Sequence, residues 1–101
     1  MIEIQTTANE AQEPPSAPLF SIDGVEYSAR TEFRPNEALW YMNLLVRKGF
    51  NFACDWALRT SLGREGHAAL MSCEALSQQQ MEEIVSAVLR PIVGALDGPK
   101  A

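Results

Sequence analysis

The chain has 101 residues, enough for one domain and too few for a second of ordinary size. Apolar residues make up 47% of the sequence, so the chain can form a hydrophobic core and is not disordered throughout. The net charge of −5 at pH 7 argues against binding to nucleic acids or anionic membranes, because both repel an acidic protein.

Cysteine content and the first residues bear on where the protein works. Cys54 and Cys73 are too few for a disulfide framework, so we expect both to be reduced thiols. Glu3, Glu10 and Glu13 occupy the region in which a secretory signal would carry Lys or Arg. No apolar run approaches the roughly 18 residues of a membrane-spanning helix. The sequence therefore predicts a protein that stays in the cytoplasm of the cell that makes it.

Composition divides the chain into a tail and a domain. Residues 1–17 are rich in Thr, Gln, Glu and Pro, and we expect them to form a flexible tail. Residues 18–98 are expected to form a single α-rich domain that begins with a β-hairpin. Residues 99–101 are expected to be a short C-terminal tail.

The hairpin is indicated by two alternating apolar and polar runs on either side of Asp-Gly at positions 23–24. This dipeptide favours a two-residue type I′ turn, in which both residues have positive φ angles. Closing the hairpin there pairs Ile22 with Val25 and Phe20 with Tyr27, and places all four side chains on one face. Because an isolated hairpin is marginally stable in water, this face should pack on the helices that follow.

Three helices are expected to follow the hairpin. Asn36 would cap the first, and Gly49 and Gly63 would end the first and second, because glycine readily adopts the left-handed conformation at helix ends. The expected ranges are about 36–48, 50–62 and 64–72.

A fourth helix is the most strongly indicated. Ser77, followed three residues later by Gln80, forms a capping box. Apolar residues then recur at helical spacing over residues 81–96 and make a broad apolar face. Pro91 removes one hydrogen bond inside this helix and should kink it. The expected fold is therefore mainly α, with the hairpin packed on three to four helices.

Patterns that would support catalysis or metal binding are weak. His67 and the two cysteines could supply three zinc ligands, but no fourth ligand and no Cys-x-x-Cys pair fixes such a site. No third group is evident to orient a Cys–His nucleophilic pair. Glu82 and Glu83 fall in the first turns of a capped helix, where carboxylates favour the helix dipole. We expect no catalytic residues, no metal, no cofactor and no enzyme activity.

Aromatic and apolar side chains in the helices instead favour binding to another protein. The first predicted helix is apolar nearly all round, and such a helix is either central in its domain or buried against a partner. Trp40 sits in the middle of one polar stripe and Trp56 flanks another. Tryptophan is enriched at interfaces, although both rings could also cover the edge of the core. The candidate partner-binding residues are Trp40, Tyr41, Leu44, Trp56, Ile92, Val93 and Leu96.

Several segments occur in an order that matches a known family. They are Phe20-Ser21-Ile22-Asp23-Gly24-Val25-Glu26-Tyr27, Ala38-Leu39-Trp40-Tyr41, Leu62-Gly63-Arg64-Glu65-Gly66, Ala68-Ala69-Leu70-Met71, Leu76-Ser77 and Val93-Gly94-Ala95-Leu96-Asp97-Gly98-Pro99-Lys100. In this order, the chain resembles the small tail assembly chaperones of long, non-contractile-tailed phages, especially those of actinobacterial hosts. The resemblance covers about residues 19–100.

The resemblance implies a function in tail assembly within the host cell cytoplasm. Such chaperones bind the long, apolar, helical tape measure protein, keep it soluble, and leave as tail tube subunits polymerise around it. Helix-in-groove docking by many small helical copies could cover the apolar stripes of such a client. The resemblance also implies that a ribosomal frameshift produces a longer second form of the chain. It implies no catalytic residues, and self-association through the apolar helices stays open.

Two other functions fit the same sequence. The first is a small structural tail or head–tail joining component that is retained in the virion. The second is a regulatory adaptor directed at a host protein. Neither requires a catalytic site, so both are compatible with the absence of recognisable chemistry in the sequence.

Overall fold

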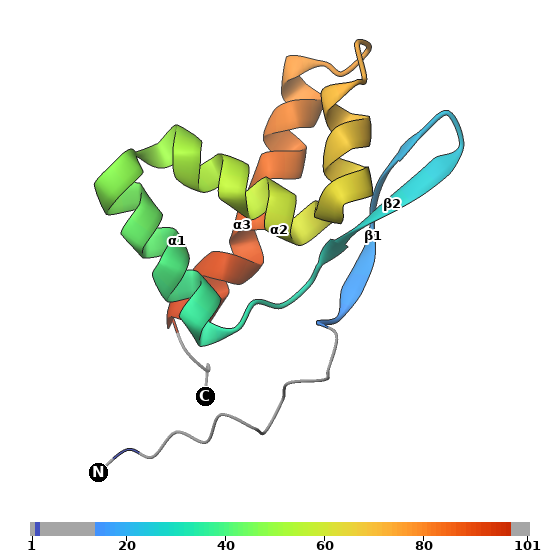
Figure 1. Ribbon diagram of the computed structural model, residues 1–101. Helices are drawn as coiled ribbons and strands as arrows, with labels where there is room; N and C mark the ends of the chain where they lie inside the picture. The colour runs from blue at the N-terminus through green and yellow to red at the C-terminus, as the bar shows by residue number, and fades with distance from the viewer. Residues whose placement is uncertain (1, 3–13, 98–101) are drawn as a thin grey trace.

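Two strands and three helices make up the part of the chain that the computed structural model describes, which comprises residues 2 and 14–97. They are β1 (Ser16–Ile22), β2 (Val25–Arg30), α1 (Pro35–Lys48), α2 (Phe50–Met71) and α3 (Gln78–Asp97). Figure 1 shows the antiparallel hairpin β1–β2 beside the helices, with α3 passing behind α2 to reach α1. The predicted fold, a hairpin packed on a mainly helical domain, is confirmed. Most of the predicted N-terminal tail and the C-terminal tail lie outside the described residues.

The hairpin has the predicted turn and pairing. Asp23 and Gly24 have φ angles of 50° and 84°, as a type I′ turn requires. Ile22 pairs with Val25, and Phe20 pairs with Tyr27, whose ring stacks on that of Phe20 at a centroid distance of 5.3 Å. A register shift between Pro18 and Phe20 accommodates one extra residue in β1. The strand begins at Ser16, two residues before the predicted start of the domain.

Helix α1 begins one residue earlier than predicted and is capped differently. Arg34 is the N-cap residue, Pro35 occupies the first turn, and the Glu37 carboxylate accepts a hydrogen bond from the Arg34 backbone N–H at 2.9 Å. Asn36 therefore lies within the helix, and the expectation that it caps α1 was wrong. The end of the helix is as predicted, because Gly49 has a φ of 92° and its N–H donates to the carbonyls of Leu44 and Leu45.

Helix α2 contains the second and third predicted helices. Gly63, with φ 76° and ψ 175°, is non-helical and separates the two parts, which run in clearly different directions in Figure 1. No atom lies within 4 Å of a Cβ built at this glycine, so its backbone angles, and not lack of space, are the reason for glycine there. The break at Gly63 therefore follows the sequence prediction.

Helix α3 starts with the predicted capping box. The Gln80 backbone N–H donates to the Ser77 hydroxyl at 3.1 Å, and the Ser77 backbone N–H donates to the Gln80 side-chain oxygen at 2.9 Å. The helix continues through Pro91 to Asp97. Its buried face, including Val88 and Ile92, meets α1 and α2 in the core. Among the described residues, no helix is long and apolar enough to cross a membrane.

Candidate protein-binding surface

Exposed apolar side chains concentrate on α1 and the start of α2. Single exposed apolar side chains are ordinary on any protein surface. Here, however, six of the eleven large hydrophobic residues exposed in the described part of the chain fall within one stretch of 14 residues. They are Leu39, Trp40, Met42, Val46, Phe50 and Phe52. This clustering indicates a surface that another protein could cover.

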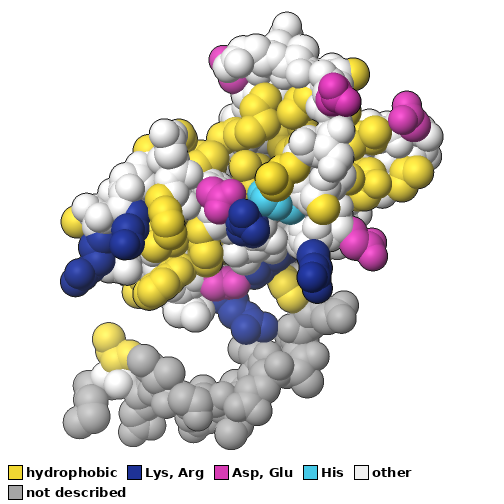
Figure 2. Space-filling view, turned by 45° about the horizontal axis from the view of Figure 1, so that its top comes forward, with side chains coloured by type: hydrophobic (Ala, Val, Ile, Leu, Met, Phe, Trp, Pro, Cys, Tyr) yellow, Lys and Arg dark blue, Asp and Glu magenta, His cyan; other side chains and the backbone are white. Residues whose placement is uncertain are grey.

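Three of these residues make a continuous stripe along α1. Leu39, Met42 and Val46 follow one another at helical spacing, so their side chains lie on one face. Leu39 is 62% exposed and Val46 is 85% exposed. We name these three residues the α1 stripe. In Figure 2, hydrophobic side chains are exposed over the left part of the molecule, where α1 and the start of α2 lie, beside Lys and Arg side chains.

The candidate residues taken from the sequence divide into two groups in the structure. Trp40, Val93 and Leu96 are exposed, and Trp56 is half-buried against the core. The other three are buried in the core among residues from all three helices, so in this structure no partner can reach them. These are Tyr41, Leu44 and Ile92. Their place in the candidate surface is corrected, because burial against the chain's own helices already covers them.

The α1 stripe replaces the buried candidates. Its residues belong to a helix that the sequence shows to be apolar nearly all round, but the sequence could not say which apolar face the domain would cover. Ala38, Tyr41 and Leu45 pack toward the core. Each residue of the stripe follows one of these along the chain and is exposed. The sequence did carry a signal for the stripe, because α1 has a second apolar face in addition to the one that packs in the core.

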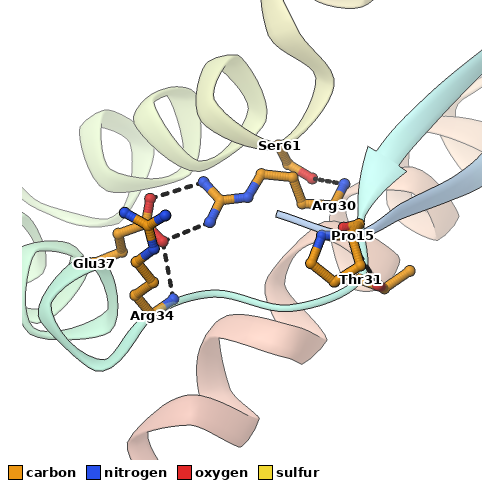
Figure 3. Close-up of polar contacts among 6 residues, drawn as sticks. All are labelled: Pro15, Arg30, Thr31, Arg34, Glu37 and Ser61. Atoms are coloured by element: carbon orange, nitrogen blue, oxygen red, sulfur yellow. Dashed lines mark hydrogen bonds and ion pairs between the residues drawn. The ribbon is translucent and has the colours of Figure 1, made fainter. Parts of the chain in front are cut away.

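A partly buried ion pair holds α1 against the hairpin. Figure 3 shows the Arg30 guanidinium, at the end of β2, donating two hydrogen bonds to the Glu37 carboxylate, at N–O distances of 2.7 and 2.5 Å. The same guanidinium lies 4.3 Å above the centroid of the Phe33 ring. The backbone N–H of Arg30 donates to the Ser61 hydroxyl of α2 at 3.2 Å. Arg30 thus contacts α1, α2 and the segment between β2 and α1. These contacts fix the orientation of α1.

The electrostatics of this pair favour the ionised carboxylate. Hydrogen bonding to Arg30 lowers the pKa of Glu37, and the bond from the Arg34 backbone lowers it further, against an opposing effect of burial. The side chain of Arg30 is only 12% exposed, and its Nε atom is buried with no hydrogen-bond partner. Because a planar guanidinium pairs with a carboxylate through two parallel bonds, lysine could not reproduce this contact.

The thiol and imidazole groups considered in the sequence lie on α2 and in the loop that follows it, with Cys54 before Gly63 and His67 after it. His67 is buried, and its Nε2 lies 3.6 Å from Oδ1 of Asp55. The other carboxylate oxygen of Asp55, Oδ2, accepts a hydrogen bond from Arg59 at 2.8 Å. Burial, with a smaller effect of Asp55, raises the pKa of the Cys54 thiol. In the described part of the chain, no group of three or more His, Cys, Asp or Glu residues is arranged to hold a metal ion.

Comparison with known proteins finds no relative of this chain. The sequence matches no protein-family model, and neither curated proteins nor solved structures give a significant match.

Proposed function

We propose that this protein is a phage tail assembly chaperone that binds the tape measure protein and keeps it soluble until the tail tube forms around it. The observation that carries the proposal is the α1 stripe, together with the exposed aromatic residues beside it. The resemblance of the sequence to tail assembly chaperones gives this surface its expected client.

The physical requirements of such a chaperone agree with these features. A long helical client with exposed apolar stripes would aggregate unless those stripes were covered. An amphipathic client helix could lay its apolar face against a neighbouring apolar helix such as α1. The stripe has only three residues, so each copy would bind weakly, and many copies on one client would still cover it reversibly. The net charge of −5 would help the complex to stay in solution.

The test is co-expression of the gene with the tape measure protein of the same genome. The natural 3′ region of the gene should be retained, so that any longer frameshifted form is also made. We expect a larger soluble fraction of the tape measure protein and co-purification of this chain with an affinity-tagged client. If the solubility of the client does not rise and no complex forms, the proposal is wrong.

A pair of variants links the result to the α1 stripe. The double substitution Leu39→Asn and Val46→Asn removes apolar surface from the stripe without entering the core, and should abolish most of the gain in solubility. Met71→Asn, which removes a similarly exposed apolar side chain at the far end of α2, should leave the gain intact. Equal effects of the two variants would show that the stripe is not the binding surface.

Mass spectrometry of purified virions separates this proposal from the structural alternative. A chaperone should be missing from finished particles, because the tube subunits displace it. A structural tail or head–tail joining component should be present in a fixed number of copies per particle. Detection of the chain at such a level would favour that alternative.

A further inference from the structure

A second apolar surface lies between the hairpin and the helices, away from α1. It is a groove of about 480 Å³ between β1, the end of α2, the loop that follows and the first turns of α3. Its apolar lining includes Leu19, Phe20, Ile22, Leu70, Leu76 and Ile84. Figure 2 shows hydrophobic side chains gathered in this upper part of the molecule, between the hairpin and the helices. We call this surface the hairpin groove.

The walls of the hairpin groove come from well-anchored elements. On one side, the stacked rings of Phe20 and Tyr27 stiffen the hairpin. On the other side, the Ser77–Gln80 capping box fixes the start of α3. Ile84 is buried, so the bottom of the groove belongs to the core. The groove is therefore a formed feature that a partner could enter without rearranging the fold.

The two charged residues that line the hairpin groove are both acidic. Asp23, in the hairpin turn, and Glu83, on α3, line the groove directly. The stretches 18–29 and 65–89, which include all of the lining residues, contain six carboxylates and no Lys or Arg. The six are Asp23, Glu26, Glu65, Glu74, Glu82 and Glu83. Arg30 and Arg90 line a separate pocket that meets the groove at Leu19. In Figure 2, acidic side chains border the upper part of the molecule, and every Lys and Arg visible lies in the lower part.

We infer that the hairpin groove binds an amphipathic helical segment of a partner protein, in which apolar side chains are flanked by Lys or Arg. The apolar residues would enter the groove, and the cations would lie near Asp23 and Glu83. A second copy of this chain is a less suitable occupant, because two copies that each carry a net charge of −5 repel one another. This inference concerns a surface distinct from the α1 stripe and does not depend on the identity of the client.

The inference can be tested with three synthetic helical peptides labelled with fluorescein. All three contain leucines, and they differ in charge or in arrangement. The first has a leucine stripe flanked by Lys, the second has the same stripe flanked by Glu, and the third has the composition of the first with its leucines scattered around the helix. Fluorescence anisotropy with the full chain should show that the first binds at least about tenfold more tightly than either other peptide. The difference should shrink at about 0.5 M salt, where ion pairs are screened.

Matched variants locate the binding. Glu83→Gln removes a charge that lines the groove, and Glu82→Gln removes a neighbouring charge that does not. Asp23→Asn removes the other lining charge and retains a residue type that tolerates positive φ. We expect Asp23→Asn together with Glu83→Gln to weaken binding of the Lys-flanked peptide about tenfold, and Glu82→Gln alone to change it less than about twofold.

Three results would overturn the inference. Equal binding of the striped and scattered Lys peptides would show that only charge is recognised. Equal effects of Glu82→Gln and Glu83→Gln would show that binding occurs outside the groove. Concentration-dependent self-association that Asp23→Asn with Glu83→Gln abolishes, measured by sedimentation velocity, would assign the groove to a second copy. None of these results bears on the co-expression experiment, so failure here is distinguishable from failure of the proposed function.

Discussion

The neighbouring residues Ile92 and Val93 allow a direct test of which face of α3 the domain covers. Ile92 is fully buried, whereas Val93 is 48% exposed. Ile92→Ala removes three buried carbon atoms, each worth about 0.8 kcal/mol, and leaves a cavity that adds to the loss, so we expect a destabilisation of about 3 kcal/mol. Val93→Ala removes two half-exposed carbon atoms, and the higher helix propensity of alanine offsets much of that loss. The expected net change is within about 0.5 kcal/mol.

Thermal unfolding followed by circular dichroism measures the difference. For a domain of this size, about 3 kcal/mol corresponds to a fall in Tm of roughly 12–24 °C, and Val93→Ala should shift the Tm by no more than about 4 °C. The unfolding transition of Ile92→Ala should remain cooperative, because a stability of 5–15 kcal/mol is typical of such domains. If both variants shifted the Tm equally, or if Ile92→Ala had no effect, the placement of α3 beyond Pro91 would be wrong.

Three further predictions concern the ion pair, two glycines and a thiol. Because hydrogen bonding lowers the pKa of Glu37 in the folded state, its contribution to stability is present above the unfolded-state pKa of about 4.3 and is lost as pH falls through the lower folded value. Glu37→Gln should therefore reduce the free energy of unfolding at pH 7 and flatten its fall at acidic pH in urea titrations; an unchanged acid profile would contradict this. Gly63→Ala should cost about 1–2 kcal/mol because φ is 76°, whereas Gly94→Ala, within α3 and with no atom near its added Cβ, should stabilise by about 0.5–1 kcal/mol in the same titrations. Because burial raises the pKa of Cys54, iodoacetamide should alkylate it more slowly in the folded Cys73→Ser variant than in the same variant in urea, and equal rates would refute the burial.

Local chemistry explains why the turns and helix ends could be predicted. Asp23 and Gly24 need no distant contact to favour a type I′ turn, and Gly49 and Gly63 supply positive φ angles wherever the surrounding helices pack. The capping box at Ser77 is likewise complete within four residues. Each of these features depends on the conformational preferences of adjacent residues, which the sequence states directly.

The cap of α1 could not be predicted from the neighbouring residues alone. Asn36 is a good capping residue in isolation, but the helix starts at Pro35 because Glu37 reaches back to the Arg34 N–H. Glu37 is held in that position by Arg30, which lies on β2 and is not part of the helix. A contact between two elements thus selected the cap, and no pattern within the helix could have shown it.

The choice of buried face on α1 could not be predicted for a related reason. Ala38, Tyr41 and Leu45 face the domain, and the residues of the stripe, Leu39, Met42 and Val46, have the same spacing shifted by one position. Periodicity alone cannot tell which of the two sets is buried, because each forms an apolar row along a helix. The packing of α1 against α2 and α3 decides between them, and this packing buried two residues, Tyr41 and Leu44, that the sequence had suggested for binding.

The exposed face of α1 is therefore a consequence of how the helix is held. The core residues Ala38 and Tyr41 fix one side of α1, and the pairing of Glu37 with Arg30 fixes its N-terminal end to the hairpin. These contacts leave little freedom for the helix to rotate and bury the stripe instead. A rigid apolar face loses less conformational entropy when a partner binds than a flexible one would. The stripe thus remains exposed in the unbound protein, as the proposed binding of a client requires.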